Sequence, residues 1–288
     1  SYTFFATAGC IARLGAIPIF IDVHADSFNL DVADAASKLT SKTKAILPVH
    51  LYGQSADMGA ITELAQERGL KVVEDCAQSM GARWKDDEVG TIGDFGTYSF
   101  FPTKNLGGFG DGGMLVTNDV DLADKARVLR VHGSKPKYYH KLIGGNFRLD
   151  ALQAALLSVK LGSLNEFLEQ RRANAVYYLK SFKSQRHQDL PLILPTEMEH
   201  CWHTWNQFTI RVMDGKRDAL QSHLKKYEIA SEIYYPLSLH QQECFRDLPA
   251  MPCHVSERLA KECLSLPIYP ELSRKMQDEV VEVVTDFL

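Results

Sequence analysis

The fold is decided by the segment Leu70-Lys71-Val72-Val73-Glu74-Asp75, which combines a near-continuous apolar centre with a carboxylate at its end. A short apolar run of this kind is typical of a strand that is buried on both faces of a parallel sheet. A helix predicted over 55–68 comes before it and ends at Gly69. We therefore expect a parallel sheet whose strands are joined by crossover helices.

Toward the N-terminus, the same alternation of helix and strand continues. The predicted helices cover 6–14 and 31–39, and the predicted strands cover 17–23 and 45–49. After Asp150 the pattern changes, because apolar residues recur at spacings of three and four over long stretches. The elements predicted there are helices 149–161, 164–182, 216–227 and 273–288 and a strand at 207–212. We expect a large domain over 1–160 and a linking helix with a small α+β domain over 161–288.

The composition is that of an ordinary globular protein. The chain has 288 residues, of which 45% are hydrophobic and 24% charged, and its net charge is −4. This balance argues against binding to nucleic acid or to an anionic membrane. The sequence contains no apolar run of about 18 residues and no signal-peptide pattern, so a cytoplasmic location is expected. The six cysteines lack a C-x-x-C pair, and no second cluster completes a metal site around residues 200–203.

The candidate catalytic residues are found at the end of the strand that contains Asp75 and after it. Open α/β sheets place ligand-contacting residues at the carboxyl ends of their strands, which makes Asp75 a site candidate. Lys104 lies in an apolar turn bounded by glycines, where desolvation would help its amine to lose a proton, as Schiff-base chemistry requires. Pyridoxal phosphate is held by such a lysine, by an acid at its ring nitrogen and by hydroxyl donors at its phosphate. Asp75, Ser99 and Lys104 supply one of each, although a lone lysine is more often a snorkelling or paired residue.

Residues 108–113 match the dinucleotide-binding pattern G-x-G-x-x-G. That pattern must follow a strand and open a helix, whereas this segment precedes a predicted strand at 114–117. We expect it to form a backbone hairpin beside Lys104, in which the glycines allow close packing.

Six strings of residues, in order along the chain, resemble those of the DegT/DnrJ/EryC1/StrS sugar aminotransferases, which have fold type I of the pyridoxal-phosphate enzymes. The strings are Thr3-Phe4-Phe5-Ala6-Thr7, Pro48-Val49-His50-Leu51-Tyr52-Gly53-Gln54, Glu74-Asp75-Cys76-Ala77-Gln78-Ser79, Ser99-Phe100-Phe101-Pro102-Thr103-Lys104-Asn105-Leu106, Asn146-Phe147-Arg148-Leu149-Asp150 with Gln153-Ala154-Ala155, and Tyr235-Pro236 with His240. The resemblance implies an α/β fold, with a mostly parallel mixed sheet flanked by helices and a smaller C-terminal α+β domain.

The resemblance also implies roles for single residues. Lys104 would form the Schiff base with pyridoxal 5′-phosphate and carry a proton between the substrate α-carbon and C4′ of the cofactor. The other cofactor contacts implied are Asp75 at the pyridinium nitrogen, Gln78 near the ring hydroxyl, Phe4 on the ring face, Ser99 at the phosphate, and Asn146 on a loop that reaches the partner's site. The substrate contacts implied are Arg148, on the same loop, together with Tyr235 and His240. Without the resemblance, Phe4 would be assigned to the core and Arg148 to a surface ion pair.

The implied reaction moves an amino group from glutamate to a keto-sugar attached to a nucleotide, in amino-sugar or polysaccharide biosynthesis. It is a ping-pong reaction in which glutamate first yields 2-oxoglutarate and pyridoxamine phosphate. The implied assembly is a homodimer with shared active sites. Family members that dehydrate carry histidine in place of the lysine, so Lys104 favours transamination. Two alternatives stay open: a non-catalytic, truncated or regulatory chain, and a pyridoxal-phosphate-dependent sugar dehydratase or decarboxylase.

The sequence begins at Ser1, inside the family's pattern. Family members carry upstream a glycine-threonine loop at a helix N-terminus, which helps to hold the phosphate and suits an anion physically. We therefore expect that an N-terminal piece is missing from this sequence. Sugar specificity would depend on pocket shape from Tyr138, Tyr139, His140 and the C-terminal domain.

Overall fold

The computed structural model describes residues 1–184, 190–249 and 251–288. Its central feature is a mixed sheet with strand order β1-β2-β5-β6. These strands are β1 (Ala45–Ile46), β2 (Lys71–Asp75), β5 (Phe95–Ser99) and β6 (Gly113–Val116). Strand β2 pairs in parallel with β1 and β5, and β5 pairs antiparallel with β6. The expected α/β fold with a mostly parallel mixed sheet is confirmed.

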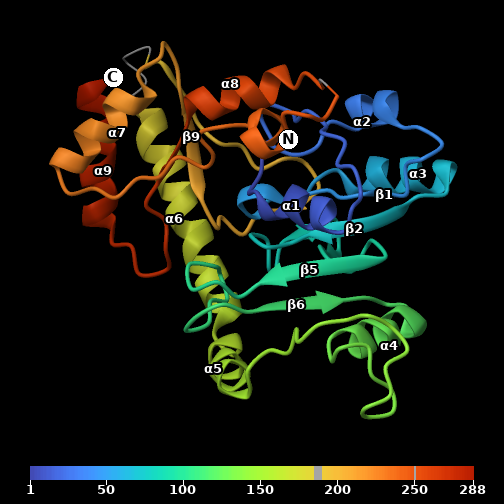
Figure 1. Ribbon diagram of the computed structural model, residues 1–288. Helices are drawn as coiled ribbons and strands as arrows, with labels where there is room; N and C mark the ends of the chain where they lie inside the picture. The colour runs from blue at the N-terminus through green and yellow to red at the C-terminus, as the bar shows by residue number, and fades with distance from the viewer. Residues whose placement is uncertain (185–189, 250) are drawn as a thin grey trace.

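Helices flank this sheet. They are α1 (Ala6–Arg13), α2 (Val32–Lys38), the 3₁₀ turn η1 (Leu51–Gly53), α3 (Met58–Arg68), α4 (Val120–Leu129) and α5 (Ala151–Leu161). Figure 1 draws α1, α2 and α3 on the β1 side of the sheet and α4 and α5 on the β6 side. Helix α3 begins where the Asp57 carboxylate accepts from the N–H of Ala60 and ends at Gly69, which has a left-handed φ of 63°. These caps fix where the chain enters β2, and the end of the helix at Gly69 is as the sequence predicts.

The C-terminal part is a smaller α+β unit built on a second sheet, with the antiparallel order β10-β9-β7. Its elements are α6 (Leu164–Ser184), β7 (Leu192–Ile193), β9 (Phe208–Val212), α7 (Arg217–Lys226), η2 (Leu239–Gln241), η3 (Glu243–Phe245), α8 (His254–Glu262), β10 (Cys263–Leu266) and α9 (Arg274–Phe287). Every residue of β9 is buried, and its core includes Tyr178, Leu220 and Val284. Within the described ranges, no helix is both long enough and apolar enough to cross a membrane.

A short antiparallel sheet joins the two parts of the chain. It consists of β3 (Arg83–Trp84), β4 (Asp87–Glu88) and β8 (Cys201–Trp202), in the order β4-β3-β8. Beside it, the buried ring of His203 stacks on Trp205 at 3.9 Å, and desolvation lowers the pKa of His203 to about 3. This histidine is therefore neutral and packs as part of the core.

Most of the predicted elements are present, with shifted ends. The helices predicted over 6–14, 31–39, 55–68, 149–161, 164–182, 216–227 and 273–288 correspond to α1, α2, α3, α5, α6, α7 and α9. The predicted hairpin is also confirmed, because residues 108–113 lead into β6, which pairs antiparallel with β5. The elements that were not predicted include α4, β5, α8 and β10, together with the short strands β3, β4, β7 and β8.

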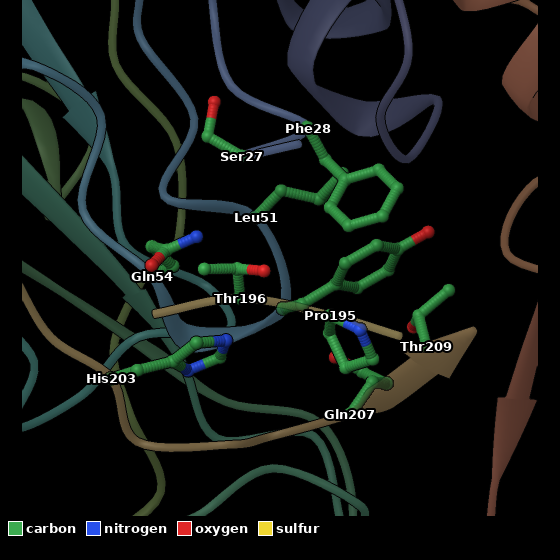
Figure 2. Close-up of a pocket in the computed structure, with 10 residues that line it drawn as sticks. Ser27, Phe28, Leu51, Gln54, Pro195, Thr196, His203, Gln207 and Thr209 are labelled. Carbon is green, nitrogen blue, oxygen red and sulfur yellow. The ribbon is translucent and has the colours of Figure 1, made fainter. Parts of the chain in front are cut away.

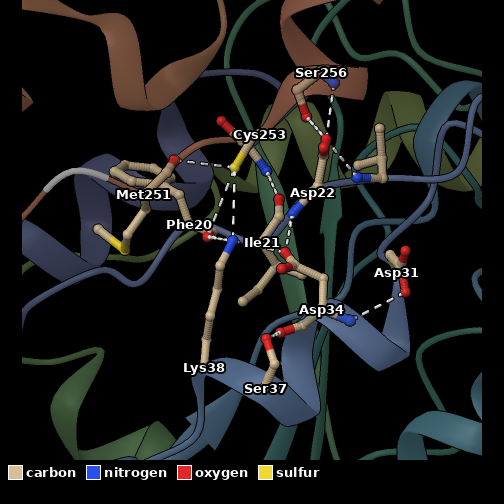
Figure 3. A network of polar contacts seen from close by, with 12 residues as sticks. Phe20, Ile21, Asp22, Asp31, Asp34, Ser37, Lys38, Met251, Cys253 and Ser256 are labelled. Carbon is tan, nitrogen blue, oxygen red and sulfur yellow. Dashed lines mark hydrogen bonds and ion pairs between the residues drawn. The ribbon is translucent and has the colours of Figure 1, made fainter.

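The strand predicted over 17–23 is wrong. Val23 makes only an isolated bridge to Leu30, and some of the neighbouring backbone groups bond to side chains instead of to a strand. The carboxylate of Asp34 accepts from the N–H of Asp22 at 2.7 Å, and the amine of Lys38 donates to the carbonyl of Phe20 at 3.0 Å. Figure 3 shows this network at the junction of α2 and the chain before α8. Apolar composition predicted a strand here, but polar contacts with distant residues determine the conformation.

The Asp22 carboxylate caps α8 from 233 residues away in sequence. Its oxygens accept from the N–H of Val255 at 2.9 Å, and from the N–H and hydroxyl of Ser256 at 2.8 and 2.7 Å. Those N–H groups belong to the first turn of α8, where they have no partner within the helix. Asp22 therefore ties the N-terminal part of the chain to the C-terminal unit.

Replacing Asp22 with alanine is expected to lower the free energy of unfolding by about 1 kcal/mol, the usual size of a helix cap. Burial raises the pKa of the Asp22 carboxyl, but hydrogen bonds from Ser256 and Val255 outweigh burial and hold this pKa below its ordinary value. The difference in the free energy of unfolding between wild type and variant therefore has its full size above about pH 4. It is lost as the pH falls through the lowered pKa. Urea unfolding at a series of pH values measures it. The exposed Asp26→Ala is the control, and equal losses in both variants would contradict the capping role.

Candidate active site

Asp75 lies at the carboxyl end of β2, between two parallel neighbours. Its backbone pairs with Thr97 of β5 and makes a bridge to Val49 on the other side. The half-buried carboxylate accepts from the hydroxyl of Thr7 at 2.8 Å through Oδ2 and from the N–H of Ala77 at 3.1 Å through Oδ1. Both oxygens thus accept from uncharged donors, which fix the orientation of the carboxylate.

Glu74, the preceding residue, is fully buried and points to the opposite face of β2. Its Oε1 accepts from the N–H groups of Ile92 and Gly93 at 2.9 and 2.6 Å, and its Oε2 accepts from Gly90 N–H at 2.7 Å. Nε2 of His50 lies 2.9 Å from the same Oε2. Burial alone would raise the pKa of Glu74, but these donors hold it below its ordinary value.

His50, Glu74 and Cys76 bring three metal-ligand atoms within 4.8 Å of one another. The Nδ1 of His50 accepts from the N–H of Ala56 at 3.0 Å, so its Nε2 carries the proton that is donated to Glu74. The carboxylate already has four donors, and burial raises the pKa of the Cys76 thiol. The cluster is therefore a hydrogen-bonded support for the end of β2 and not a metal centre.

Lys104 lies on the loop that joins β5 to β6. Burial lowers the pKa of its amine, and the negative charge of Asp75 only partly opposes this effect. In the described part of the chain, the Lys104 amine makes no hydrogen bond and no ion pair. An amine that is half-buried, unpaired and easier to deprotonate is suited to forming a Schiff base.

The loop that carries Lys104 is fixed by its own backbone and by α5. The N–H of Lys104 donates to the carbonyl of Phe101 at 2.9 Å, and that of Gly108 donates to the carbonyl of Phe100 at 2.8 Å. Lys160 of α5 donates to the carbonyl of Gly107. A Cβ at position 107 would lie only 2.2 Å from the carbonyl oxygen of Pro102, so the loop can close in this form only with glycine there.

Ser99 ends β5, close in sequence to Lys104. Its Oγ accepts from the N–H of Phe101 at 3.2 Å, which leaves the hydroxyl proton available to a ligand. The carboxylate of Asp75, the amine of Lys104 and the hydroxyl of Ser99 therefore carry the charges and donors that pyridoxal phosphate requires. The observation that supports this fit is the desolvated Lys104 amine, which has no hydrogen-bond or ion-pair partner among the described residues.

Gln78 and Tyr235 are also brought together, although they lie in different parts of the chain. The amide of Gln78 donates to the hydroxyl of Tyr235 at 3.2 Å, and the ring of Phe4 lies 6.0 Å from that of Tyr235. Burial raises the pKa of Tyr235, and the charge of Asp75 adds to this effect. Phe4 is 60% exposed, so its ring face is available and it is not a core residue.

Three predicted site residues are not joined to this group in the described chain. Asn146 and Arg148 are exposed, and the one contact between them is the Oδ1 of Asn146 near the N–H of Arg148 at 3.5 Å. His240 is 2.9 Å from Glu257 and 2.7 Å from the hydroxyl of Ser1. Tyr138 and Tyr139, predicted to shape the sugar pocket, are 78% and 70% exposed.

Four residues that support the site were not predicted from the sequence, namely Thr7, Glu74, His50 and Tyr52. A signal was present for Glu74, because a glutamate inside an apolar strand must find donors if it is to be buried. No local pattern marks Thr7, whose contact with Asp75 spans 68 positions in sequence.

Comparison with known proteins identifies the family of this chain. The model of the DegT/DnrJ/EryC1/StrS aminotransferase family matches residues 1–285. A protein of Geobacillus stearothermophilus named pleiotropic regulatory protein is 51% identical and is matched over 100% of this chain and 77% of its own length. The UDP-N-acetyl-3-dehydro-alpha-D-glucosamine 3-aminotransferase of Acidithiobacillus ferrooxidans is 43% identical. The match covers 99% of this chain and 75% of that protein. The solved structure of S. venezuelae DesV has a TM-score of 0.93 at 38% identity, over 99% of this chain and 76% of that one.

The chain therefore belongs to the DegT/DnrJ/EryC1/StrS aminotransferase family. It is an aminotransferase of the pyridoxal-phosphate-dependent, fold type I class, as the sequence predicts. The enzyme class, the cofactor and the fold are thus confirmed, whereas the roles of single site residues remain predictions.

Replacing Glu74 with glutamine is expected to destabilise the protein by roughly 3 kcal/mol, because the amide presents one acceptor oxygen to donors that now use two. Since the pKa of Glu74 is lowered in the folded protein, its contribution is present above about pH 4.3 and is lost as the pH falls through the lowered value. Thermal unfolding at neutral and acid pH measures this. Glu67→Gln, at an exposed position of α3, should unfold like wild type. A Glu74→Gln protein as stable as that control would show that the buried network is dispensable.

Proposed function

We propose that this enzyme transfers an amino group from glutamate to the keto group of a nucleotide-linked sugar. The observation that carries the chemistry is the desolvated Lys104 amine, which feels the charge of Asp75 but has no bonded partner in the described part of the chain. The substrate class is supported by the relative from Acidithiobacillus ferrooxidans, whose name describes an aminotransferase acting on a UDP-linked 3-dehydro sugar. The division at residue 160 and the cytoplasmic location stay predictions.

Each residue has a physical reason for its proposed role. When bound, pyridoxal phosphate supplies an electron sink for the bond broken at the substrate carbon. The Lys104 amine would hold the cofactor covalently and, when released, accept and return a proton at its Nζ. The Asp75 carboxylate, oriented by Thr7, would keep a proton on the ring nitrogen. The free hydroxyl proton of Ser99 would bind the phosphate.

Further proposed contacts surround the ring and the substrate. The exposed face of Phe4 would stack on the cofactor ring, and Gln78 would lie near the ring hydroxyl. Tyr235 would contact the substrate, because its hydroxyl already meets Gln78. Arg148 and Asn146 would act from the partner subunit's side of a shared site, and His240 would lie at the edge of the substrate pocket.

We propose a homodimer because apolar side chains are exposed along β6 and α5. Met114 and Leu115 of β6 are 49% and 47% exposed, and Leu152 and Val159 of α5 are 72% and 79% exposed. Exposed apolar side chains that lie together commonly mark an interface with another chain. Arg148, on the loop that directly precedes α5, would lie beside such an interface.

A regulatory role without catalysis is the second candidate, favoured by the name of the 51% identical relative from Geobacillus stearothermophilus. A regulatory role would not require a buried Lys104 amine with a lowered pKa. The presence of lysine at position 104 favours transamination over dehydration.

Pyridoxal phosphate added to the purified chain is expected to give the visible absorbance of a lysine-bound cofactor, and glutamate should bleach it with release of 2-oxoglutarate. Lys104→Ala should abolish the band and lower kcat by roughly 1,000-fold or more. Absorbance spectra and coupled measurement of 2-oxoglutarate provide the test. The control is Lys42→Ala, at an exposed position. An unchanged band in Lys104→Ala would refute the assignment of the lysine, and release of ammonia or carbon dioxide instead would refute transamination.

Co-expression of Lys104→Ala with Arg148→Ala is expected to restore activity that neither variant has alone. If each site takes Lys104 from one subunit and Arg148 from the other, a mixed dimer holds one intact site. Random pairing then gives about a quarter of wild-type activity. Differently tagged subunits allow the mixed dimers to be isolated and assayed. No recovery in an isolated mixed dimer would mean that the sites are not shared in this way.

A further inference from the structure

We propose that Tyr52 and Tyr2 are positioning residues whose hydroxyls hold the Tyr234–Tyr235 peptide so that Tyr235 stays in contact with Gln78. The inference rests on the proposed function, in which Tyr235 contacts the substrate and Gln78 lies near the cofactor. Neither buried tyrosine is given a role by the chemistry above.

Two phenols converge on the Tyr234–Tyr235 peptide. The hydroxyl of Tyr2 donates to the carbonyl of Tyr234 at 2.5 Å and accepts from the N–H of Tyr235 at 3.2 Å. The hydroxyl of Tyr52 also donates to the Tyr234 carbonyl and lies 3.4 Å from the hydroxyl of Tyr2. A carbonyl oxygen has two lone pairs, so it can accept from both phenols at once. The peptide is thus held at its carbonyl and at its N–H.

Tyr52 also holds the other end of the Gln78–Tyr235 contact. Its backbone N–H donates to Oε1 of Gln78 at 2.7 Å, so the amide nitrogen of Gln78 is the end that faces Tyr235. One residue therefore orients the Gln78 amide through its backbone and the Tyr235 peptide through its side chain. Tyr52 adopts a left-handed φ of 60°, an unfavourable conformation that is kept where the surroundings require it.

The environment leaves Tyr52 no alternative position. Its side chain is 2% exposed, and its ring meets that of Phe28 edge-on at 5.2 Å. The cavity beside it has a volume of about 10 Å³ and is lined by residues that include Leu51, Gln207 and Thr209 (Figure 2). That space holds one water molecule at most. Burial raises the pKa of both Tyr52 and Tyr2, so both phenols remain protonated donors at neutral pH.

The hydroxyls are shared between two regions far apart in sequence. Tyr2 and Tyr52 belong to the N-terminal part of the chain, whereas Tyr234 and Tyr235 come from the segment that leads from β9 and α7 toward α8. Loss of the two phenolic hydroxyls would leave the packing of the rings intact. Only the hydrogen bonds that align Tyr235 would be removed. A positioning role therefore predicts a change in substrate binding that depends on Tyr235.

The test compares Tyr2→Phe, Tyr52→Phe and the double variant in the cofactor-loaded chain. We expect the KM for the nucleotide-linked sugar to rise about tenfold in the double variant, with kcat changed less than about threefold and the cofactor absorbance unchanged. In a Tyr235→Phe background the same substitutions should cause no further rise, because the contact they align is already absent. The matched control is Tyr178→Phe, since Tyr178 is also buried and its hydroxyl has no partner in the described chain.

The proposal would be overturned if the Tyr2 and Tyr52 substitutions raised KM further in the Tyr235→Phe background. It would also be overturned if KM did not change in the double variant. A crystal structure of the double variant gives an independent reading, in which the distance from Nε2 of Gln78 to the Tyr235 hydroxyl should exceed about 3.5 Å. A distance still near the 3.2 Å of the wild-type chain would also overturn it. If the double variant does not fold, Tyr2→Phe alone decides by the same two measurements. If wild type transfers no amino group to nucleotide-linked sugars, the proposed function fails, and the crystallographic distance still judges the positioning role.

Discussion

The buried carboxylate of Glu74 is the constraint on which the candidate site depends. A charge with no exposed surface is tolerated only if donors surround it, and here the donors come from His50 and from three N–H groups of residues 90–93. Those groups can reach Glu74 only if the loops after β1 and before β5 fold back onto the end of β2. Asp75 is the next residue, and its own backbone hydrogen-bonds Pro48 and His50 of the first of these loops. The buried charge on one face of the strand therefore fixes the carboxylate on the other face.

The same constraint extends to the C-terminal part of the chain. Through its Nδ1, His50 also holds the N–H of Ala56, so both ends of the turn that contains Tyr52 are fastened. Tyr52 then contacts Gln78 through its backbone and Tyr234 through its hydroxyl. A path of hydrogen bonds thus leads from the centre of the sheet to Tyr235. The cap that Asp22 provides for α8 ties the two parts together at a second place.

Local chemistry predicted much of the fold and part of the site. Gly69, the apolar centre of β2 and the helical periodicity after Asp150 each act over a few residues, and the structure agrees with them. Lys104 and Asp75 were identified because few residue types can perform the chemistry that they suggest. The strand predicted over 17–23 is absent because groups outside the segment, including the Asp34 and Lys38 side chains, bond to its backbone. Thr7 was missed because its contact with Asp75 spans 68 positions in sequence. Sequence periodicity carries no information about such contacts, since they exist only once the chain has folded.

The relation between Lys104 and Asp75 shows why the exact placement of these charges matters. The negative charge of Asp75 favours a protonated lysine, whereas burial favours the neutral amine, and burial has the larger effect. A direct ion pair would reverse this balance, because a carboxylate in contact stabilises the ammonium strongly. In the described chain Asp75 makes no such contact with Lys104, and its oxygens accept from Thr7 and Ala77. Because no carboxylate is in contact with it in the described chain, the buried Lys104 amine loses its proton more easily than an exposed lysine does. One site can therefore contain both the Asp75 carboxylate and an amine at Lys104 that deprotonates easily.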